Sequence, residues 1–572
     1  MSDFLQDLLT KDMTFVMSYL AVLRYVAPLL AILLLWRCCK PLLTFRQEPE
    51  IWGYLCLPDG HRQPVTHWES VIGRHKKSDL VVNFPTVSRN HAVLTRYDDG
   101  SWSITDTGSK SGVLVNGRKV RLCPVGAEDV INIGGVELRL QPVSDEEEKE
   151  LTQQRTKASS PVDCIANVLL LSIFQALLCL GFMLGGKDEH AISVFAGFGT
   201  IICLQWLLMI AYMIIRRPAF EVETIAFFLC TLGMAVICTV KPGEVVKQLI
   251  ALGMGLTLFL FIGGTMRNLE RVKTVRKVAA VLGLLLLAAT LLFGTTYYGA
   301  KNWLVIGPLS LQTSELCKVC FVFVGASAMD RLVNRFNLFF FIGYTLMICG
   351  CLALMNDFGT AIVFFCAFLM IAYLRSGSVG TVGLAITALG FAGTIALKLA
   401  PHALRRFSTW RHIWESPFDA GFQQTRALMC LASGGFFGLG AGQGWLKNVF
   451  AADSDIVFAT IAEEWGLIMA VVPVLLIVVL ALFAMRCAAV SRSSFYAIGA
   501  CTAGTILVVQ TIFNVLGTVD VLPLTGVTFP FLSNGGSSMI CTWGLLAFIK
   551  AADTRQNASF AVRLGVARRN KR

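Results

Sequence analysis

Four carboxylates fall close together in FAADSDIVFATIAEEWG, residues 450 to 466, namely Asp453, Asp455, Glu463 and Glu464. The stretch joins a polar segment to a long apolar run, so these acids lie at a membrane boundary. A carboxylate held at such a boundary can accept a proton as a general base. Ser454 and Asp455 are also good caps for a helix that begins at Ile456, so helix capping competes with catalysis as their role. We expect Glu463 and Glu464, one to two helical turns deeper, to shape a polar cavity.

Two further places put charge inside apolar segments, where an unpaired charge costs on the order of 3 kcal/mol. Glu315 and Lys318 stand three residues apart at the start of one run, so they can pair on one helix face. Asp357 opens the run NDFGTAIVFF and is predicted to cap its helix. Such residues are candidates for function, although a purely structural role explains the Glu315 and Lys318 pair equally well.

A third polar set lies outside the apolar runs in three pieces, IGR at 72–74, SRNH at 88–91 and DTGSKSGVLVNG at 106–117. Arg74 and Ser88 bring a guanidinium and a hydroxyl, which are suitable donors for a doubly charged phosphate. The separate histidines His61, His67 and His75 have no metal-ligand spacing and are expected at the surface.

The elements that must position these residues are of two kinds. The chain of 572 residues is 55% hydrophobic with a mean hydropathy of +0.65, which excludes a soluble globule and predicts a polytopic α-helical membrane protein. About 13 spans are expected, near 14–36, 164–184, 192–215, 220–240, 246–266, 278–297, 314–329, 336–355, 358–375, 380–400, 456–484, 495–517 and 537–551. Between residues 51 and 140, short alternating runs separated by Gly, Asp-Gly and Asn-Gly predict an all-β sandwich. Asn116 and Gly117 within it predict a type I′ hairpin turn.

The formal net charge of +12 does not indicate a nucleic-acid partner, because the basic residues gather beside the apolar runs. This positive-inside pattern predicts a multi-pass protein of the plasma membrane, with the β sandwich and the C-terminus in the cytoplasm and residues 401–455 outside. Most of the 18 cysteines lie in apolar runs without metal-ligand spacing. We interpret them as small buried side chains and predict no metal site.

The three polar pieces occur in the order found in forkhead-associated (FHA) domains, and residues 51–140 resemble that family. The resemblance implies binding of phosphothreonine in a partner, either a Ser/Thr kinase or another phosphorylated protein. The residues implied in phosphopeptide binding are Arg74, Ser88, Arg89, Lys110 and Ser111, with His91 supporting the loop. The family usually has Asn-Gly-Thr where this chain has Ser-Gly-Val at 111–113. The alternative is a sandwich that serves as a docking module without phosphate recognition.

From about residue 295 to 550 the segments GAKNWLVIGPLSLQTSELCK, NDFGTA, GFQQTRALMCLASGGFFGLGAGQG, DSDIVFATIAEEWG, NVLG and LPLTGVTFPFLSNGGSS occur in order. This part of the chain resembles the SEDS family of FtsW, RodA and SpoVE. Members of that family are peptidoglycan glycosyltransferases that polymerise lipid II at the outer face of the bacterial plasma membrane. Their usual partner is a class B penicillin-binding protein that acts as transpeptidase. Compared with the family, this chain has an added N-terminal span and an added pair of spans.

Carried over to this sequence, the resemblance makes Asp455 the essential aspartate of a large outer loop. We predict that it is the general base for the attacking sugar hydroxyl, a contribution of about 10²- to 10⁴-fold, and that Asp453 serves local electrostatics or capping. The residues expected in the substrate cavity are Glu315, Lys318, Arg406, Gln423, Ser537 and Ser538. Lys318 and Arg406 are the expected cations for the leaving pyrophosphate. A divalent cation, magnesium or manganese, is the alternative, although the sequence shows no dedicated cage for it.

Two other functions fit the same residues. The first is a flippase or transporter of lipid-linked precursors, because buried charges and glycine-broken helices also suit substrate pathways. The second is a membrane-bound phospho-signalling scaffold of the cell-wall machinery. The expected parts of the chain are a transmembrane anchor at 1–40, an FHA-like domain at 41–142, an acidic linker at 143–162, a SEDS-like transmembrane domain at 163–552 and a basic cytoplasmic tail at 553–572. The linker is expected to be flexible and solvated.

Overall fold

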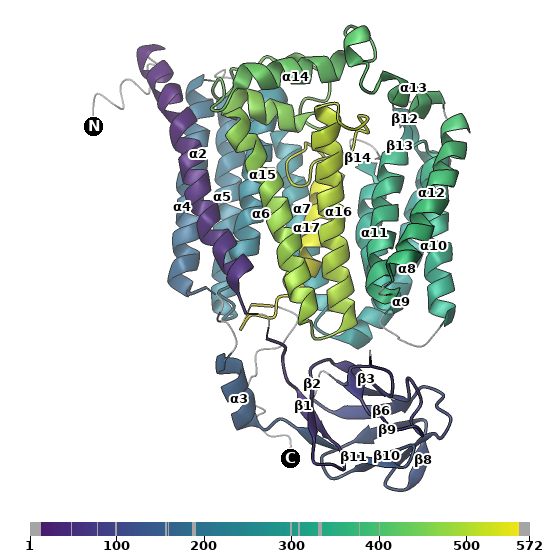
Figure 1. Ribbon diagram of the computed structural model, residues 1–572. Coiled ribbons are helices and arrows are strands. Elements are labelled where there is room, and N and C mark those ends of the chain that lie inside the picture. The colour runs from purple at the N-terminus through teal and green to yellow at the C-terminus, as the bar shows by residue number, and fades with distance from the viewer. Residues whose placement is uncertain are drawn as a thin grey trace.

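The computed structural model places a bundle of long helices above a β sandwich (Figure 1). It describes residues 13–559 except 47, 77, 98–99, 155–156, 158, 186–189, 298–299, 307–308, 330–334, 377, 400 and 557. Most of the predicted basic tail and the first residues of the predicted anchor lie outside the described residues.

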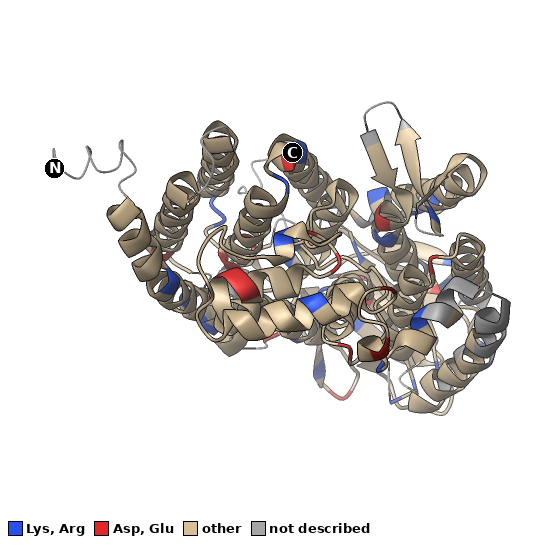
Figure 2. Ribbon diagram, turned by 90° about the horizontal axis from the view of Figure 1, so that it is seen from above, with Lys and Arg blue, Asp and Glu red and all other residues tan. Residues whose placement is uncertain are grey.

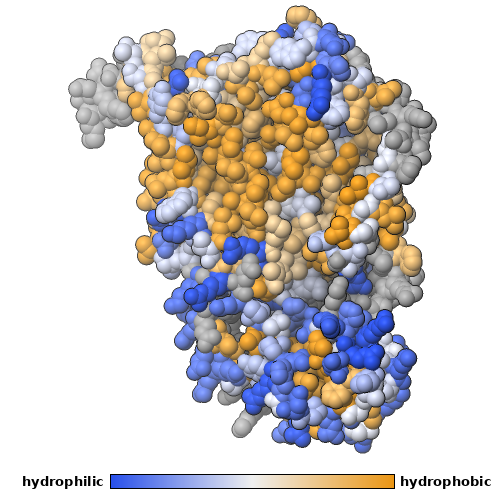
Figure 3. All heavy atoms as spheres, in the orientation of Figure 1, coloured by the Kyte–Doolittle hydropathy of each residue, from blue (hydrophilic) through white to orange (hydrophobic). Residues whose placement is uncertain are grey.

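Thirteen long helices are present among the described residues, and they confirm the predicted polytopic fold. They are α2 (Met13–Thr44), α4 (Pro161–Gly185), α5 (Ala191–Ile214), α6 (Glu221–Val240), α7 (Val245–Thr265), α8 (Leu269–Phe293), α9 (Thr313–Met329), α10 (Arg335–Leu354), α11 (Phe358–Ser376), α12 (Val379–Leu399), α15 (Val457–Ala489), α16 (Ser494–Thr518) and α17 (Gly536–Ala551). Nine of the described helices are long and apolar enough to cross a membrane. On the face drawn in Figure 3, the helices form a broad apolar band, and the surface of the β sandwich below it is mostly hydrophilic.

The β sandwich consists of two packed sheets. One has six strands in the order β2-β1-β11-β10-β7-β8 and the other has five in the order β4-β3-β5-β6-β9. Their bounds are β1 (Gly53–Cys56), β2 (Arg62–Val65), β3 (Glu69–Gly73), β4 (Leu80–Val81), β5 (Ala92–Arg96), β6 (Trp102–Asp106), β7 (Val113–Val115), β8 (Arg118–Val120), β9 (Leu122–Val125), β10 (Val130–Ile133) and β11 (Val136–Pro142). Asn116 and Gly117 join β7 to β8 with φ angles of 51° and 79°, as the type I′ prediction requires.

The segment after the sandwich differs from the predicted flexible linker, because it contains the helix α3 (Asp145–Gln154). The Ser144 hydroxyl accepts the N–H of Glu147 at 3.3 Å and so caps the first turn. The glutamates that made the segment look solvated are also good helix formers, and they favour the N-terminal end of a helix.

Helices α2, α4 and α5 form a group beside α6 and α15 (Figure 1). A buried amide cluster joins three of these helices: Gln175 and Gln205 exchange hydrogen bonds of 3.0 and 2.8 Å, and Gln175 also donates to Thr231. Such bonds suit a membrane interior because each buried polar group finds a partner. At its other flank α2 contacts the loop before α15, where the Tyr25 and Phe437 ring centroids are 5.0 Å apart.

A buried charge network joins the β sandwich to the helical part of the protein. Arg492, in the turn between α15 and α16, binds both carboxylate oxygens of Glu50 at 2.7 and 3.0 Å. The same turn accepts the Trp68 N–H at 2.7 Å through its Arg492 carbonyl. A bidentate pair of this kind fixes orientation as well as distance. The sandwich is therefore held against the α15–α16 end of the bundle.

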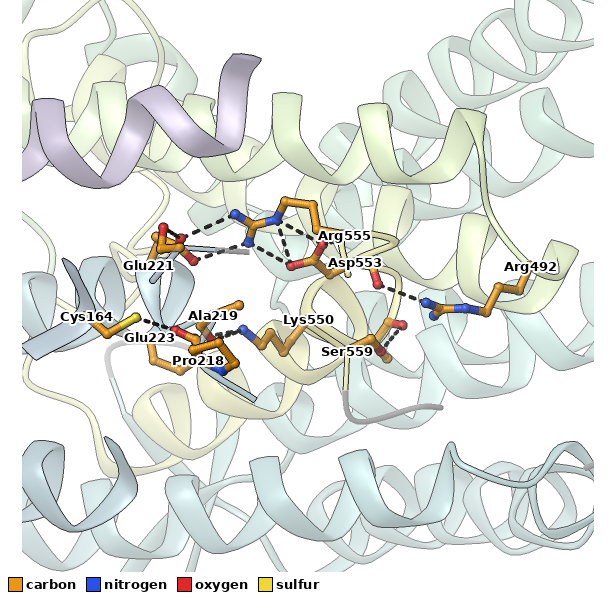
Figure 4. A network of polar contacts seen from close by, with 12 residues as sticks. Cys164, Pro218, Ala219, Glu221, Glu223, Arg492, Lys550, Asp553, Arg555 and Ser559 are labelled. Atoms are coloured by element: carbon orange, nitrogen blue, oxygen red, sulfur yellow. Dashed lines mark hydrogen bonds and ion pairs between the residues drawn. The ribbon is translucent and has the colours of Figure 1, made fainter. Parts of the chain in front are cut away.

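The network continues into the last described residues, as Figure 4 shows. Arg555 binds Asp553 at 2.8 Å and Glu221 at 3.2 Å, and Lys550 binds Glu223 at 3.2 Å. These side chains are almost completely buried, so each carboxylate needs a cation beside it. Residues 553–555, the first of the predicted tail, thus pack against α6.

The opposite end of the bundle carries the long segment before α15. It contains α13 (Pro401–Thr409), the short helix η3 (Ile413–Glu415), α14 (Phe422–Gly434) and the short helix η4 (Leu446–Asn448). A three-stranded sheet, β12 (Thr295–Tyr297), β13 (Ala300–Ile306) and β14 (Leu309–Gln312), lies between α8 and α9 in the chain and projects beside the bundle when this end is viewed from above (Figure 2). This end holds the candidate catalytic residues.

Candidate functional site

Asp455 lies in a tight turn directly before α15. Ala451 has a positive φ of 58°, and its carbonyl accepts the backbone N–H groups of Ser454 at 3.1 Å and Asp455 at 3.0 Å. The N-cap of α15 is Ile456, and no side chain makes a capping hydrogen bond there. Capping by the Ser454 or Asp455 side chain, the alternative to a catalytic role, is therefore not observed at this helix start. The Asp455 carboxylate remains available for other contacts.

The Asp455 carboxylate has one oxygen engaged and one without a donor among the described residues. The Ser454 hydroxyl donates to Oδ1 at 3.0 Å. Oδ2 faces Gly526, where a Cβ atom would lie only 3.3 Å away, and the φ of +72° at Gly526 also favours glycine. Burial raises the pKa of Asp455 above its ordinary value of 3.8, and the Ser454 hydrogen bond and the Arg406 charge act in the opposite direction. A raised pKa favours proton acceptance near neutral pH.

Asn514 of α16 fixes the turn that carries Asp455. Its side-chain NH₂ donates to the carbonyls of Ser454 at 3.2 Å, Asp455 at 3.1 Å and Val527 at 3.0 Å. Asn514 begins the NVLG segment, whose sequence alone indicates no particular role for it. An amide inside an apolar helix was the available signal, since a buried amide needs partners. Here those partners join the Asp455 turn to the segment that holds Gly526.

Arg406 and Gln423 approach the same region from the long loop. The Arg406 guanidinium donates to the Thr525 carbonyl at 3.0 Å, next to Gly526, and its charge reaches Asp455. The Gln423 amide donates to the Phe450 carbonyl at 2.9 Å and so holds the chain just before the Asp455 turn. The structure thus brings Arg406 together with Asp455, whereas Gln423 supports the loop.

Asp453 connects three segments around the turn. Its buried carboxylate binds Lys241 at 2.9 Å and accepts the Asn534 amide at 2.7 Å. The Asn534 N–H also donates to the Asp453 carbonyl at 2.8 Å. Lys241 follows α6 and Asn534 precedes α17, so Asp453 fastens both to the loop. These contacts agree with the predicted role of Asp453 in local electrostatics.

Glu463 and Glu464, predicted to shape a polar cavity, are both buried against the preceding loop. The two oxygens of Glu463 accept the N–H groups of Trp445 at 2.8 Å and Leu446 at 2.9 Å, and Thr239 donates to Glu464 at 2.9 Å. The helix is broken one turn later, at residue 466, where φ is 84°. Backbone groups of residues 435–440 bond the freed carbonyls of 463 and 464 and the N–H groups of 467 and 468. The two glutamates therefore anchor the loop.

The other predicted cavity residues lie deeper, at the start of α9 and α17. Lys318 donates to Glu315 at 2.6 Å, which confirms the predicted pair, and both side chains are buried. Ser537 accepts the Gln312 N–H at 2.9 Å, and Ser538 bonds the Thr528 hydroxyl at 2.8 Å. None of the described contacts joins the Glu315 and Lys318 pair to Asp455.

Asp357 has the predicted capping role. Its carboxylate accepts the N–H of Thr360, in the first turn of α11, at 3.2 Å, and it also accepts the Asn302 amide at 3.3 Å. These bonds satisfy an otherwise free donor of the helix N-terminus. Asp357 therefore has a structural explanation.

At the far end of the molecule, the β sandwich gathers its polar residues on neighbouring loops. Arg74 is exposed after β3 and donates to the Pro85 carbonyl at 3.3 Å. The Ser88 hydroxyl accepts the Lys110 N–H at 3.2 Å, which joins the two loops. His91 is fully buried, accepts the Ser88 N–H at 3.1 Å and contacts the Gly112 carbonyl at 3.0 Å. The exposed side chains of Arg89, Lys110 and Ser111 complete this set.

Within the described part of the chain, no three His, Cys, Asp or Glu side chains converge to hold a metal ion. These residues provide no protein cage for magnesium or manganese, and we assign no step to a metal.

The fold and these sites define a multi-pass membrane protein with an FHA-type β sandwich near its N-terminus. The FHA domain model matches residues 70–134, and the FtsW/RodA/SpoVE model, described as a cell cycle protein, matches residues 220–558. The chain belongs to the FtsW/RodA/SpoVE family and carries an FHA domain. The family match begins just before α6 and leaves α2, α4 and α5 outside it.

Individual relatives carry more specific names. The probable peptidoglycan glycosyltransferase FtsW of Buchnera aphidicola subsp. Acyrthosiphon pisum is 31% identical over 283 residues, covering 48% of this chain and 71% of that protein. The probable peptidoglycan glycosyltransferase FtsW of Alkalilimnicola ehrlichii is 32% identical over 288 residues, covering 48% of this chain and 72% of that protein. A solved chain from work on polymerization and crosslinking by a peptidoglycan synthase complex is 25% identical, with a TM-score of 0.50 over 58% of this chain and 96% of that chain.

Proposed function

We propose that this chain is a peptidoglycan glycosyltransferase that polymerises lipid II, with Asp455 as the general base. The observation that carries the proposal is the Asp455 carboxylate, fixed by its backbone and by Ser454 while Oδ2 has no described donor. The names of the family relatives support the reaction class. The raised pKa of Asp455 supports its role as a proton acceptor.

In the proposed reaction, the 4-hydroxyl of one lipid-linked sugar attacks the anomeric carbon of another. The new C–O bond forms as the bond from that carbon to the pyrophosphate breaks, and the hydroxyl proton passes to Asp455. Undecaprenyl pyrophosphate leaves with the electron pair. Arg406 is exposed beside Asp455 and supplies positive charge for the leaving group. Lys318 is a weaker candidate for that role, since its amine is buried and bonded to Glu315.

The remaining predicted cavity residues have supporting roles in this proposal. Gln423 holds the loop before Asp455, and Ser537 and Ser538 fix the start of α17 against β14 and Thr528. Gln423 is partly exposed, so we expect a direct substrate contact from it, whereas Ser537 and Ser538 are almost completely buried and act through the segments that they hold.

We also propose that the reaction takes place at the outer face of the membrane. After its break at residue 466, α15 continues to Ala489 and is about 35 Å long over that part. The turn that carries Asp455 lies before one end of α15, and the FHA domain lies beside the other end. The basic residues next to the apolar runs favour the cytoplasm for the FHA end. Asp455 is then outside, where a class B penicillin-binding protein could crosslink the product. The solved peptidoglycan synthase complex supports such a partner.

The test is a polymerisation assay in detergent, in which no bilayer separates two compartments. The purified full chain, with and without its transpeptidase partner, is incubated with lipid II, and the products are separated by gel electrophoresis. Glycan chains are the expected result. If no chains form under any of these conditions while the protein moves lipid II across vesicle membranes, the flippase hypothesis replaces this one.

We further propose that the FHA domain binds phosphothreonine in a kinase or another cell-wall protein and thereby regulates synthesis. Arg74 and Ser88 lie on adjoining loops that His91 holds together, and both carry suitable phosphate donors. Fluorescence titration of the full chain should show tighter binding of phosphothreonine peptides than of unmodified ones. Arg74→Ala should remove the difference, and equal affinities in the wild type would contradict phosphate recognition. If Asp455→Asn complements a deletion fully while Arg74→Ala does not, the scaffold hypothesis is favoured.

A further inference from the structure

The recognition loops of the FHA domain, together with the β7–β8 hairpin beside them, carry more positive charge than one phosphate can neutralise. Residues 74–91 and 106–121 contain eight Lys and Arg against two acids. Both acids hold the loops from within, since Asp79 accepts the Val71 N–H at 2.8 Å and Asp106 accepts the Ser109 N–H at 2.9 Å. A phosphothreonine brings a charge of about −1.5 to −2. A singly phosphorylated ligand without other acids therefore leaves these loops with a surplus of positive charge.

Lys119 of β8 lies against the end of the loop after β6, the loop that also contains Lys110. A Cβ atom on Gly112 would be 2.4 Å from Cε and 3.0 Å from Nζ of Lys119, so the lysine side chain lies directly across Gly112. Gly112 has a φ of +78° and therefore favours glycine, which leaves the space that Lys119 occupies. The position is exposed, and Nζ makes no hydrogen bond or ion pair with any residue in the described part of the domain.

Gly112 lies close to the predicted phosphate donors, so Lys119 lies near them as well. The Gly112 carbonyl contacts His91, whose ring accepts the Ser88 N–H. Lys110, two residues before Gly112, donates its N–H to the Ser88 hydroxyl. Two residues span at most about 7 Å, so the Lys119 ammonium lies on the order of 10 Å from that hydroxyl. An extended peptide covers this distance in about three residues.

We propose that Lys119 forms a second anion subsite that takes a carboxylate or a second phosphate within about three residues of the phosphothreonine in the same peptide. The ligand class is therefore an acidic or doubly phosphorylated threonine peptide. This inference rests on the proposed phosphothreonine recognition and narrows its partner. The second anion supplies the negative charge that is still needed after the phosphothreonine has bound.

The test uses the full chain in detergent and peptides with a central phosphothreonine in an alanine-rich host. One aspartate, or one further phosphothreonine, is placed in turn at each of the three positions on either side. The variants are Lys119→Met and, as the matched control, Arg118→Met. Arg118 is the neighbouring exposed cation of β8, and the pleat turns its side chain to the other face of the sheet. Fluorescence anisotropy gives each Kd.

We expect the wild type to prefer aspartate at one position by about threefold and a second phosphate there by about tenfold. Lys119→Met should reduce both ratios to about one and leave the affinity for the singly phosphorylated host within about twofold, while Arg118→Met keeps both preferences. Preference for the phosphate alone would assign the subsite to phosphate, and preference for both would assign it to anions in general. Preferences that survive in Lys119→Met, or vanish equally in Arg118→Met, would overturn the subsite. If phosphothreonine binds with no preference at any position, only this inference fails, whereas absence of all phosphothreonine binding overturns the proposed recognition as well.

Discussion

Replacing Asn514 by leucine should separate the positioning of Asp455 from its chemistry. The amide gives two N–H donors to three carbonyls, of Ser454, Asp455 and Val527. Two net hydrogen bonds are worth about 1–3 kcal/mol, and the Val527 carbonyl loses the one donor described for it, so the total loss is about 2–4 kcal/mol. A shift of about 1 Å in a reacting group costs about 10²-fold in rate. We therefore expect a folded protein with a lower Tm and a kcat reduced by about 10²-fold.

The assay measures lipid II polymerisation at saturating substrate, at a temperature well below the lowest Tm of the series. Gln510→Leu is the matched control, since Gln510 is one turn earlier on α16 and equally buried. Its side chain makes one long bond, of 3.5 Å to Thr528, among the residues that the structure describes. It should cost less than about 1 kcal/mol and little activity. Activity of Asn514→Leu within a factor of about three of the wild type, or equal losses in both variants, would refute the positioning argument.

Three further changes test other contacts. Arg406→Ala removes a charge that lowers the pKa of Asp455, so the acid limb of the pH–rate profile should move to higher pH; an unchanged limb would show that the two do not interact. Glu315→Gln leaves the Lys318 ammonium buried without its partner and should destabilise the protein by about 3–5 kcal/mol, whereas replacing both residues with apolar ones should recover much of the thermal stability. Gly466→Ala places a Cβ 2.2 Å from a loop carbonyl, at a residue whose φ is 84°. The free energy of unfolding should therefore fall by about 1–3 kcal/mol. An unchanged Tm would contradict the close contact between the loop and α15.

The sequence predicted those parts of the fold that depend on local pattern. Apolar runs of span length located the helices, because a membrane interior requires such runs. The Asn116 and Gly117 hairpin followed equally directly, since few residues tolerate its φ angles. The Glu315 and Lys318 pair and the Asp357 cap were also predictable, as each depends on residues three positions apart in one helix.

The contacts that the sequence did not predict lie between distant segments. Capping by Ser454 or Asp455, the alternative to catalysis, fits the local sequence, but neither side chain makes a capping hydrogen bond at the start of α15. Glu463 was predicted to shape a cavity. Its hydrogen-bond partners in the loop, Trp445 and Leu446, could not be recognised from residue spacing because they lie far away along the chain. The role of Asn514 was missed for the same reason, since the carbonyls that it bonds lie on two other segments. Residue spacing identifies the residue types in such a site, but it does not identify the hydrogen-bond partners of those residues.

The proposed role of Asp455 can be measured directly with a single substitution. The full chain and its Asp455→Asn variant are compared for glycan chain formation from lipid II in detergent, with Glu415→Gln as a control that removes an exposed acid from the same loop. We expect Asp455→Asn to keep the wild-type Tm and lose at least about 10²-fold in rate, while Glu415→Gln remains active. Glycan chains formed by Asp455→Asn at the wild-type rate would contradict the assignment of this carboxylate as the general base.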